Sequence, residues 1–291
     1  MATFQTLGIV GKQHDDPPTR ATIQRLVGHL HRRAIAVRLE QQLAAALNAA
    51  PGVPLSQLGH HCDLVVVVGG DGTLLHAARE ISAQQIPLVG INLGRLGFLV
   101  DVSPSDLEHG LDRILDGEFE VDDRSVLDAR IEGARGRAVN DVVIHKWNTV
   151  RMIEFETYID GRFVNAQRSD GLIISTPTGS TAYALSGGGP LIHPRIDALV
   201  LVPICPHTLS NRPLVVAGDS HIEIRICGDD LEQVRVTCDG QLDLPLIPGA
   251  PVRIERSAHR LRLLHPRGHD HYAILRAKLG WGGHIRAGVP C

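Results

Sequence analysis

The chain of 291 residues is 43% hydrophobic and 21% charged, which is typical of a globular protein with one large or two ordinary domains. Its formal net charge of -3 and its aromatic content of 3% argue against a nucleic acid or an anionic membrane as the main partner. No apolar run reaches the ~18 residues of a membrane-spanning helix, and the first residues lack the pattern of a secretory signal. The five cysteines are widely spaced, without a Cys-x-x-Cys pair, and predict reduced, mostly buried thiols in a cytoplasmic protein.

The first 117 residues alternate between strand and helix patterns, which predicts an α/β domain built on an open, mostly parallel sheet. Residues 64–68 are a continuous β-branched run, as expected of a strand that is buried on both faces. Ser103 is expected to cap a helix that continues to Leu115. The other expected strands are residues 6–10, 34–38 and 86–91, and the other expected helices are residues 19–32, 40–49 and 74–81.

Residues 118–268 follow a period of two, which predicts an all-β domain made of an antiparallel sandwich or a pair of sheets. Asp160-Gly161 and Asp239-Gly240 each follow an alternating stretch and indicate two-residue hairpin turns. Residues 130–137 are expected to form a solvated hairpin. In the last segment, residues 269–291, a helix over 272–279 is expected to return to the first domain.

The sequence VVVVGGDGT at residues 65–73 carries the clearest chemical signal. A buried strand delivers a glycine-rich turn and a helix follows at once, so the backbone can approach an anion at the positive end of the helix. A carboxylate in a phosphate-binding turn would repel phosphate by itself. Asp71 is therefore expected to hold Mg²⁺ or to take a proton from an attacking hydroxyl. The alternative is an ordinary tight turn in which Asp71 caps the helix.

Neither the Walker A pattern nor the GxGxxG dinucleotide pattern occurs, which argues against P-loop kinases and dehydrogenases. Residues 168–190 form a second glycine-rich and hydroxyl-rich stretch, in which residues 176–181 can offer several N–H and O–H donors. Asn140-Asp141 places an amide beside a carboxylate, which suits a sugar diol or an adenine edge, although an ordinary turn would use the same pair.

Several motifs together resemble bacterial NAD kinases over nearly the whole chain. They are GGDGT, NLGRLGFL (92–99), Asn140-Asp141, MIEFETYID (152–160), QRSDGLIISTPTGSTAYALSGGGP (167–190), CPHTLSNRP (205–213) and KLGW (278–281). GGDGT alone also fits the wider superfamily of diacylglycerol kinases and phosphofructokinases. A lipid or sugar kinase of that superfamily and a non-catalytic NAD(P) sensor are the two alternatives.

The resemblance implies transfer of the γ-phosphoryl group of ATP, with Mg²⁺, to the 2′-hydroxyl of the adenosine ribose of NAD. It makes Asp71 the catalytic residue, which accepts or orients the hydroxyl proton, and a ligand of magnesium only through Mg-ATP. It also implies a homo-oligomer, dimer or tetramer, whose contacts are made largely by the β-rich domain. The implied nucleotide-binding residues are Gly70, Gly72, Thr73, His76, Asn140, Asp141, Arg151, Arg168, Asp170, Thr181, Ala182, Tyr183, Ala184, Leu185, Ser186 and Gln241.

The chain departs from the family pattern at one of these positions. Asp141 stands where the family commonly has Glu, so its carboxylate is one methylene shorter. Arg168 matches the position at which NAD-specific members carry Arg, which implies a preference for NAD over NADH. His76 lies one helical turn beyond GGDGT, and either faces phosphate or lies on the helix surface.

The chain has 16 histidines, which is enough to make a zinc site worth testing against the sequence. Such a site needs three or four ligands at suitable spacing, and His269-Asp270-His271 is the nearest match. Residues 265–271 (HPRGHDH) are instead expected to be exposed in a loop before the last helix.

Overall fold

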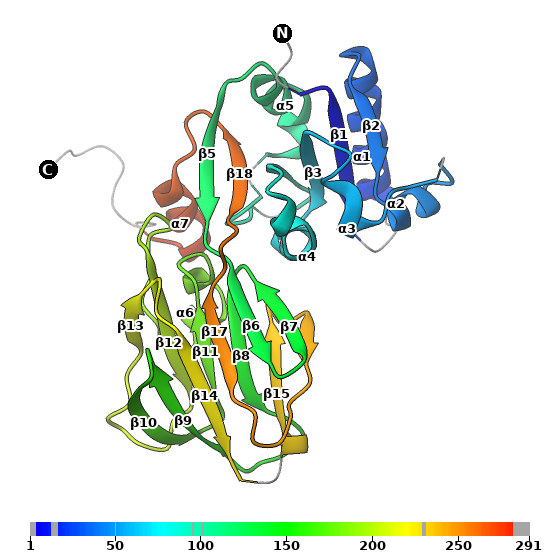
Figure 1. The fold of residues 1–291 in the computed structure, drawn as a ribbon. Coiled ribbons are helices and arrows are strands. Elements are labelled where there is room, and N and C mark those ends of the chain that lie inside the picture. Colours follow the sequence, from blue (N-terminus) through cyan, green and yellow to red (C-terminus); the bar gives the residue numbers. More distant parts are fainter. Residues whose placement is uncertain are drawn as a thin grey trace, which may run out of the picture. The chain divides into compact units, whose positions relative to one another are not determined.

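The computed structural model describes residues 4–12, 17–49, 51–94, 96–100, 102–228 and 231–281 (Figure 1). The chain forms two compact units, Met1–Asp122 together with Arg262–Cys291, and Asp123–Leu261. Within the described residues, the longest helices are too short or too polar to cross a membrane.

The first unit is built on a six-stranded sheet with the strand order β2-β1-β3-β4-β18-β5. Every pairing from β2 through to β18 is parallel. This confirms the open, mostly parallel sheet. The strands are β1 (Thr6–Gly11), β2 (Ala36–Leu39), β3 (Leu64–Gly69), β4 (Leu88–Asn92), β5 (Phe119–Arg124) and β18 (Leu261–Pro266).

The helices of this unit begin and end close to the predicted positions. Ser103 Oγ accepts a hydrogen bond from Asp106 N at 3.2 Å and caps the 3₁₀ turn that leads into α5, as predicted. The four-residue helix α3 is too short to give a periodic signal. The helices are α1 (Pro17–Arg32), α2 (Gln41–Ala46), α3 (Leu55–Leu58), α4 (Asp71–Ile81), α5 (Leu107–Leu115) and α7 (His271–Leu279), with 3₁₀ turns at Ser82–Gln84 and Pro104–Asp106.

Strand β3 is fully buried because helices cover both faces of the sheet. Leu64, Val66 and Val68 pack in one core with apolar residues of α1 and α5. Val65 and Val67 point to the opposite face, since successive side chains alternate across a strand, and they are also fully buried. The β-branched run predicted a strand of this kind.

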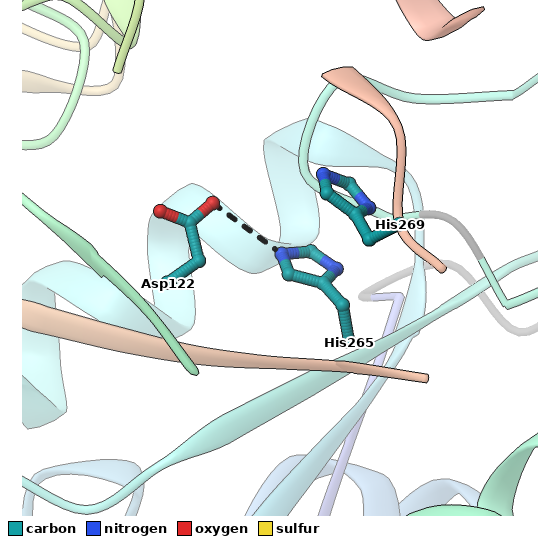
Figure 2. A group of neighbouring side chains, drawn as sticks. All are labelled: Asp122, His265 and His269. Atoms are coloured by element: carbon teal, nitrogen blue, oxygen red, sulfur yellow. Dashed lines mark ion pairs between the residues drawn. The ribbon is translucent and has the colours of Figure 1, made fainter. Parts of the chain in front are cut away.

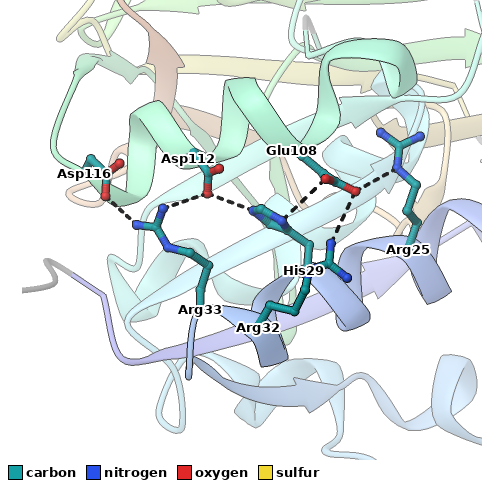
Figure 3. Close-up of polar contacts among 7 residues, drawn as sticks. All are labelled: Arg25, His29, Arg32, Arg33, Glu108, Asp112 and Asp116. Atoms are coloured by element: carbon teal, nitrogen blue, oxygen red, sulfur yellow. Dashed lines mark hydrogen bonds and ion pairs between the residues drawn. The ribbon is translucent and has the colours of Figure 1, made fainter.

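Ion pairs join α1 to α5 on one face of the sheet (Figure 3). His29 is buried and its Nε2 lies 2.8 Å from an oxygen of Asp112, while Arg33 pairs with both Asp112 and Asp116. Arg25 and Arg32 reach Glu108 at the other end of this row. The arginine pairs of this network are partly exposed, and such pairs add little stability individually, so apolar packing between the two helices contributes more.

The second unit consists of two antiparallel six-stranded sheets, as predicted, with the orders β10-β9-β14-β17-β6-β7 and β13-β12-β11-β8-β15-β16. A core around the fully buried Phe155 draws side chains from both sheets. The strands are β6 (Leu127–Ile131), β7 (Ala134–Ala138), β8 (Asp141–Lys146), β9 (Ile153–Ile159), β10 (Arg162–Ser169), β11 (Gly171–Ser175), β12 (Ala198–Ile204), β13 (Leu214–Ala217), β14 (Ile222–Cys227), β15 (Val234–Cys238), β16 (Leu242–Leu244) and β17 (Val252–Arg256). Short helical turns lie at Gly179–Thr181, α6 (Tyr183–Ser186) and Leu231–Gln233.

The hairpin predictions are confirmed by backbone geometry. Asp160 and Gly161 have φ of 51° and 75°, and Asp239 and Gly240 have φ of 52° and 62°. Positive φ at two successive turn residues matches the twist of antiparallel strands. Two residues separate the paired strand ends Ile159 and Arg162, whereas three separate Cys238 and Leu242, so the second loop is one residue longer than predicted. Strands β6 and β7 form the hairpin expected at residues 130–137.

The units divide the chain at Asp122 and Leu261 rather than at residues 117 and 268. The difference arises because β5 and β18 complete the sheet of the first unit. The period-two pattern identifies strands but does not reveal which sheet a strand joins. Helix α7 belongs to the first unit, which confirms the expected return of the C-terminal helix.

Two expectations about single residue types are wrong. Cys205 and Cys227 are exposed and Cys62 is half-buried, so the described thiols are not mostly buried; Cys291 lies outside the described residues. His265 is not in an exposed loop: it lies in β18 with 2% of its surface exposed.

Candidate active site

The glycine-rich turn connects β3 directly to α4. Gly70 is extended, with φ of -103° and ψ of -175°, and it is the N-cap residue of the eleven-residue helix. At Gly69 a Cβ atom would lie 2.5 Å from Thr73 Oγ1, so the turn has no room for a side chain there. The positive end of α4 therefore opens beside exposed backbone at Gly70 and Gly72, as required for binding an anion.

Asp71 does not cap the helix, so the alternative of a simple capped turn is wrong. Asp71 is the first residue of α4, and its carboxylate binds the loop that carries NLGRLGFL. Oδ2 accepts the Phe98 N–H at 2.9 Å and Oδ1 accepts the Leu99 N–H at 3.1 Å. At Gly97 a Cβ atom would lie 2.1 Å from Asp71 Oδ1, so a glycine is needed for this close approach. The carboxylate is thus fixed in position.

The other residues predicted near this turn belong to the same unit. Thr73 is half-buried, and Lys278 of the KLGW motif lies 5.4 Å from the centre of the Phe98 ring. His76 is half-buried on α4, with its Nδ1 3.5 Å from a guanidinium nitrogen of the buried Arg79. In the motif NLGRLGFL, Arg95 lies outside the described residues.

The second unit contains a cavity of about 520 Å³, a size typical of sites for small molecules. Four predicted residues line it, namely Asn140, Asp141, Ala182 and Tyr183. The rest of its lining was not predicted to belong to a site, and consists of Val143, His145, Trp147, Arg235, Thr237, Asp239, Gly240 and Asp243.

Asp239 holds Asn140 and Asp141 at the cavity. Its carboxylate accepts the backbone N–H groups of Asn140 at 2.8 Å, Val139 at 3.1 Å and Asp141 at 3.3 Å. Three N–H donors on one carboxylate fix the start of β8. Asp239 was predicted only as a hairpin residue, and the contact was missed because about 100 residues separate the partners.

Asp141 is 4% exposed although it lines the cavity. Burial, with a smaller contribution from the negative charge of Asp239, raises the pKa of Asp141 from 3.8 to about 7. Near neutral pH the group therefore exists in both forms, as a hydrogen-bond donor when protonated and as an acceptor when ionised.

The hydroxyl groups of the STPTGS segment mostly bind protein rather than pointing to a ligand. Thr176 Oγ1 donates to Val139 O at 2.6 Å, and Ser175 Oγ donates to Asn140 O at 3.2 Å. The Ser180 hydroxyl donates to Pro177 O at 2.6 Å inside the protein. The segment thus supports Asn140 from behind, a role that its composition did not reveal.

An aromatic and charged wall closes another side of the cavity. The Arg235 guanidinium lies 4.5 Å from the centre of a ring of Trp147 and is paired with Asp243 at 2.8 Å. His145 meets Trp147 edge to face, with ring centres 6.2 Å apart. A planar aromatic group can stack on such a surface. The sequence offers little signal for this wall, because its members come from β8, β15, β16 and a loop.

The remaining predicted residues of this unit do not line the cavity. Ala184 is buried in a small core with residues of β8, β11 and β12, whereas Arg151 and Arg168 are exposed. Asp170 pairs with Lys146 at 2.7 Å, at the opposite end of β8 from Asp141 and about 17 Å along the strand. The others are Thr181, Leu185, Ser186 and Gln241, each half-buried or exposed.

Comparisons with known proteins agree with this architecture. Residues 13–119 match the model of the ATP-NAD kinase N-terminal domain, and residues 139–265 match that of the C-terminal domain. The NAD kinase of Chromohalobacter salexigens is 47% identical, with 98% of this chain and 99% of that protein covered. The NAD kinase of Nitrosococcus oceani is 48% identical, with 96% and 97% covered.

Two solved structures are similar over the whole fold. Yeast NADH kinase complexed with NADH has a TM-score of 0.86 at 27% identity, covering 98% of this chain and 90% of that one. An NAD kinase from Archaeoglobus fulgidus in complex with ATP has a TM-score of 0.76 at 27% identity, covering 94% and 99%.

A parallel α/β unit with a carboxylate fixed at a glycine-rich turn, in one chain with an antiparallel β unit that carries a cavity of small-molecule size, is the arrangement expected of a nucleotide-dependent phosphotransferase. Within that class, the two domain matches and the nearly full-length relatives identify the family. The chain belongs to the NAD kinases, and its reaction is the phosphorylation of NAD with ATP.

Proposed function

We propose that Asp71 accepts or orients the proton of the 2′-hydroxyl of the adenosine ribose of NAD while the γ-phosphoryl group of ATP is transferred in line to give NADP. The observation that carries this proposal is the fixed carboxylate at the start of α4. A carboxylate has about four acceptor positions. The N–H groups of Phe98 and Leu99 take two of them, which leaves capacity for a sugar hydroxyl.

The donor set of the turn fits Mg²⁺ that arrives with ATP. Mg²⁺ keeps several waters and is usually held by one or two carboxylates together with substrate phosphates. Asp71 supplies one carboxylate beside backbone that can face phosphate. Bound magnesium would neutralise charge on the transferred phosphoryl group. Gly70, Gly72 and Thr73 would place the phosphates, and His76 lies one helical turn further along.

The cavity of the second unit is proposed to take the adenosine part of NAD. Asn140 and Asp141 offer an amide and a carboxyl group to an adenine edge or a ribose diol, and Tyr183 and Trp147 offer flat surfaces. The shorter side chain of Asp141 is compensated by the backbone bonds to Asp239, which hold this strand end at the cavity.

We further propose that the protein is a cytoplasmic homo-oligomer. Arg168 and Asp170 match family positions that contact substrate, yet Asp170 lies a strand length from the cavity residues of its own unit. Arg168 and Asp170 would contact nucleotide if they faced the nucleotide-binding site of a second copy of the chain in the oligomer. Exposed apolar residues at the ends and edges of the β-rich unit support such a contact, among them Val150, Phe163 and Leu214. The Arg168 position implies NAD rather than NADH as the preferred acceptor.

The test is an assay of NADP formation from NAD, ATP and Mg²⁺, read through an NADP-specific dehydrogenase. Loss of general acid–base help costs ~10²–10⁴-fold, so Asp71→Asn should lower kcat by that factor while NAD still binds. Glu80→Gln, on the exposed face of the same helix, is the matched control and should leave kcat unchanged. Near-normal turnover by Asp71→Asn would refute the assigned role.

A further inference from the structure

Two histidines and one aspartate meet in the first unit, away from the glycine-rich turn. Figure 2 shows Asp122, His265 and His269, which come from β5, β18 and the loop before α7. One ligand atom of each lies within 4.8 Å of the other two. We propose that these three side chains form a binding site for a transition-metal ion such as Zn²⁺.

The three side chains offer the types of ligand atom that Zn²⁺ commonly binds. Imidazole nitrogens and carboxylate oxygens are the usual non-sulfur ligands of Zn²⁺, and two imidazoles with one carboxylate leave a fourth position for water. Imidazoles also disfavour Mg²⁺ and Ca²⁺, which prefer oxygen ligands. The site is therefore distinct in chemistry from the magnesium that accompanies ATP.

The ligand atoms are already close to the separations that a bound ion requires. With Zn–ligand distances of 2.0–2.2 Å, neighbouring ligands of a tetrahedral ion are about 3.3–3.6 Å apart. His265 Nε2 and Asp122 Oδ2 are already 3.6 Å apart. The widest pair must close by no more than ~1.5 Å. His269 is half-buried and stacks on His265 with 3.9 Å between ring centres, so a rotation of its ring can supply that movement.

The turn between the two histidines is fixed before any ion binds. Gly268 has φ of 89°, a conformation that favours glycine, and this tight turn brings His269 back over His265. The turn is also bonded to β5 and α5: Gly268 N donates to Glu120 Oε1 at 2.9 Å, and Arg113 donates to Arg267 O at 2.9 Å. A preformed backbone lowers the entropic cost of assembling the ligands.

The position of the site suggests what the ion would do. The chain leaves the first unit after Asp122 and returns to it at Arg262, and the loop with His269 leads directly into α7. Asp270 is not a ligand candidate, because its carboxylate caps α7 through Tyr272 N at 2.8 Å. An ion held by Asp122, His265 and His269 would cross-link the outgoing strand, the returning strand and the start of α7.

The experiment is a calorimetric titration of Zn²⁺ into the tag-free, chelator-treated full chain in the presence of excess Mg²⁺, with thermal melting in parallel. The wild type should bind one ion that is lost or weakened at least about tenfold in His269→Gln and in Asp122→Asn. Zn²⁺ should raise the Tm of the wild type and not that of His269→Gln. His269 is half-buried, so this variant is expected to fold.

His271→Gln is the matched control, since His271 lies two residues along in α7 and outside the group. It should bind Zn²⁺ as the wild type does. Replacing Zn²⁺ with Co²⁺ should give visible absorption bands in the wild type and in His271→Gln but not in His269→Gln. The proposal is overturned if the wild type and His269→Gln bind Zn²⁺ equally, or if His271→Gln is the variant that loses it. In those cases Asp122 and His265 form an ion pair only.

Discussion

Asp141→Asn tests the electrostatics of the cavity in the second unit. The asparagine keeps the size of the side chain and cannot ionise. In the unfolded chain Asp141 ionises near its ordinary pKa of 3.8, whereas in the folded protein its pKa is about 7. Because the pKa of Asp141 is higher in the folded protein, protonation of this group contributes to the free energy of unfolding. The contribution is complete below pH 3.8 and is lost progressively as the pH rises through about 7.

The size of the effect follows from proton linkage. Between about pH 5 and pH 8 the ionisation of Asp141 should reduce the free energy of unfolding of the wild type by about 2–3 kcal/mol. The asparagine variant cannot ionise at this position, so its free energy of unfolding does not decrease in this way. Between pH 5 and pH 8 the variant should therefore gain stability relative to the wild type by the same free energy, which corresponds to about 5–10 °C in Tm for a domain of this size.

Denaturant titrations at several pH values, followed by tryptophan fluorescence, measure the difference directly, since Trp147 lines the same cavity. Asp243→Asn is the control, because its carboxylate lies at the exposed rim, where water screens the charge. The reasoning is refuted if the stability difference between Asp141→Asn and the wild type is the same at pH 5 and pH 8, or if it changes equally in Asp243→Asn.

Further predictions concern the site and its ligands. Gly97→Ala should displace the Asp71 carboxylate and lower kcat at least ~10-fold. Gly94→Ala, in the same loop with open space around it, should keep normal turnover, and equal kcat values for the two variants would contradict this reasoning. Asp239→Ala should raise KM for NAD by about tenfold or more, because three backbone N–H groups lose their acceptor. An unchanged KM would show that Asp239 is not needed to position Asn140 and Asp141 at the cavity. Removing Mg²⁺ with a chelator should abolish NADP formation, and added Mg²⁺ should restore it. The wild type should turn over NAD faster than NADH, and Arg168→Ala should lower the ratio of the NAD rate to the NADH rate. Comparable rates for both acceptors in the wild type would refute the role of Arg168.

Local sequence signals predicted most of the elements on which the site depends. The β-branched run before GGDGT is a strand buried on both faces, and a helix follows the glycines directly. Both Asp-Gly pairs are hairpin turns with positive φ. Such features can be predicted because hydrophobic periodicity and turn preferences depend on residues only a few positions apart.

The partners of the chemical groups could not be predicted in this way. Asp71 was expected to hold Mg²⁺, to accept a proton or to cap the helix, and its bonds to backbone N–H groups 27 and 28 residues further on were not predicted. Asp239 was predicted only as a turn residue, yet it positions Asn140. Each contact joins distant segments, so it exists only after the strands have paired.

The sequence by itself determined the two kinds of unit, the glycine-rich turn and the family to which the chain belongs, because local patterns and long motifs carry that information. Tertiary structure alone decided that β18 joins the parallel sheet and that His265 is buried beside Asp122. It also decided that Asp141 is buried near a second carboxylate, where its pKa is raised. The physical reason is that burial, charge proximity and strand pairing depend on distances in space, which the packing of remote segments sets.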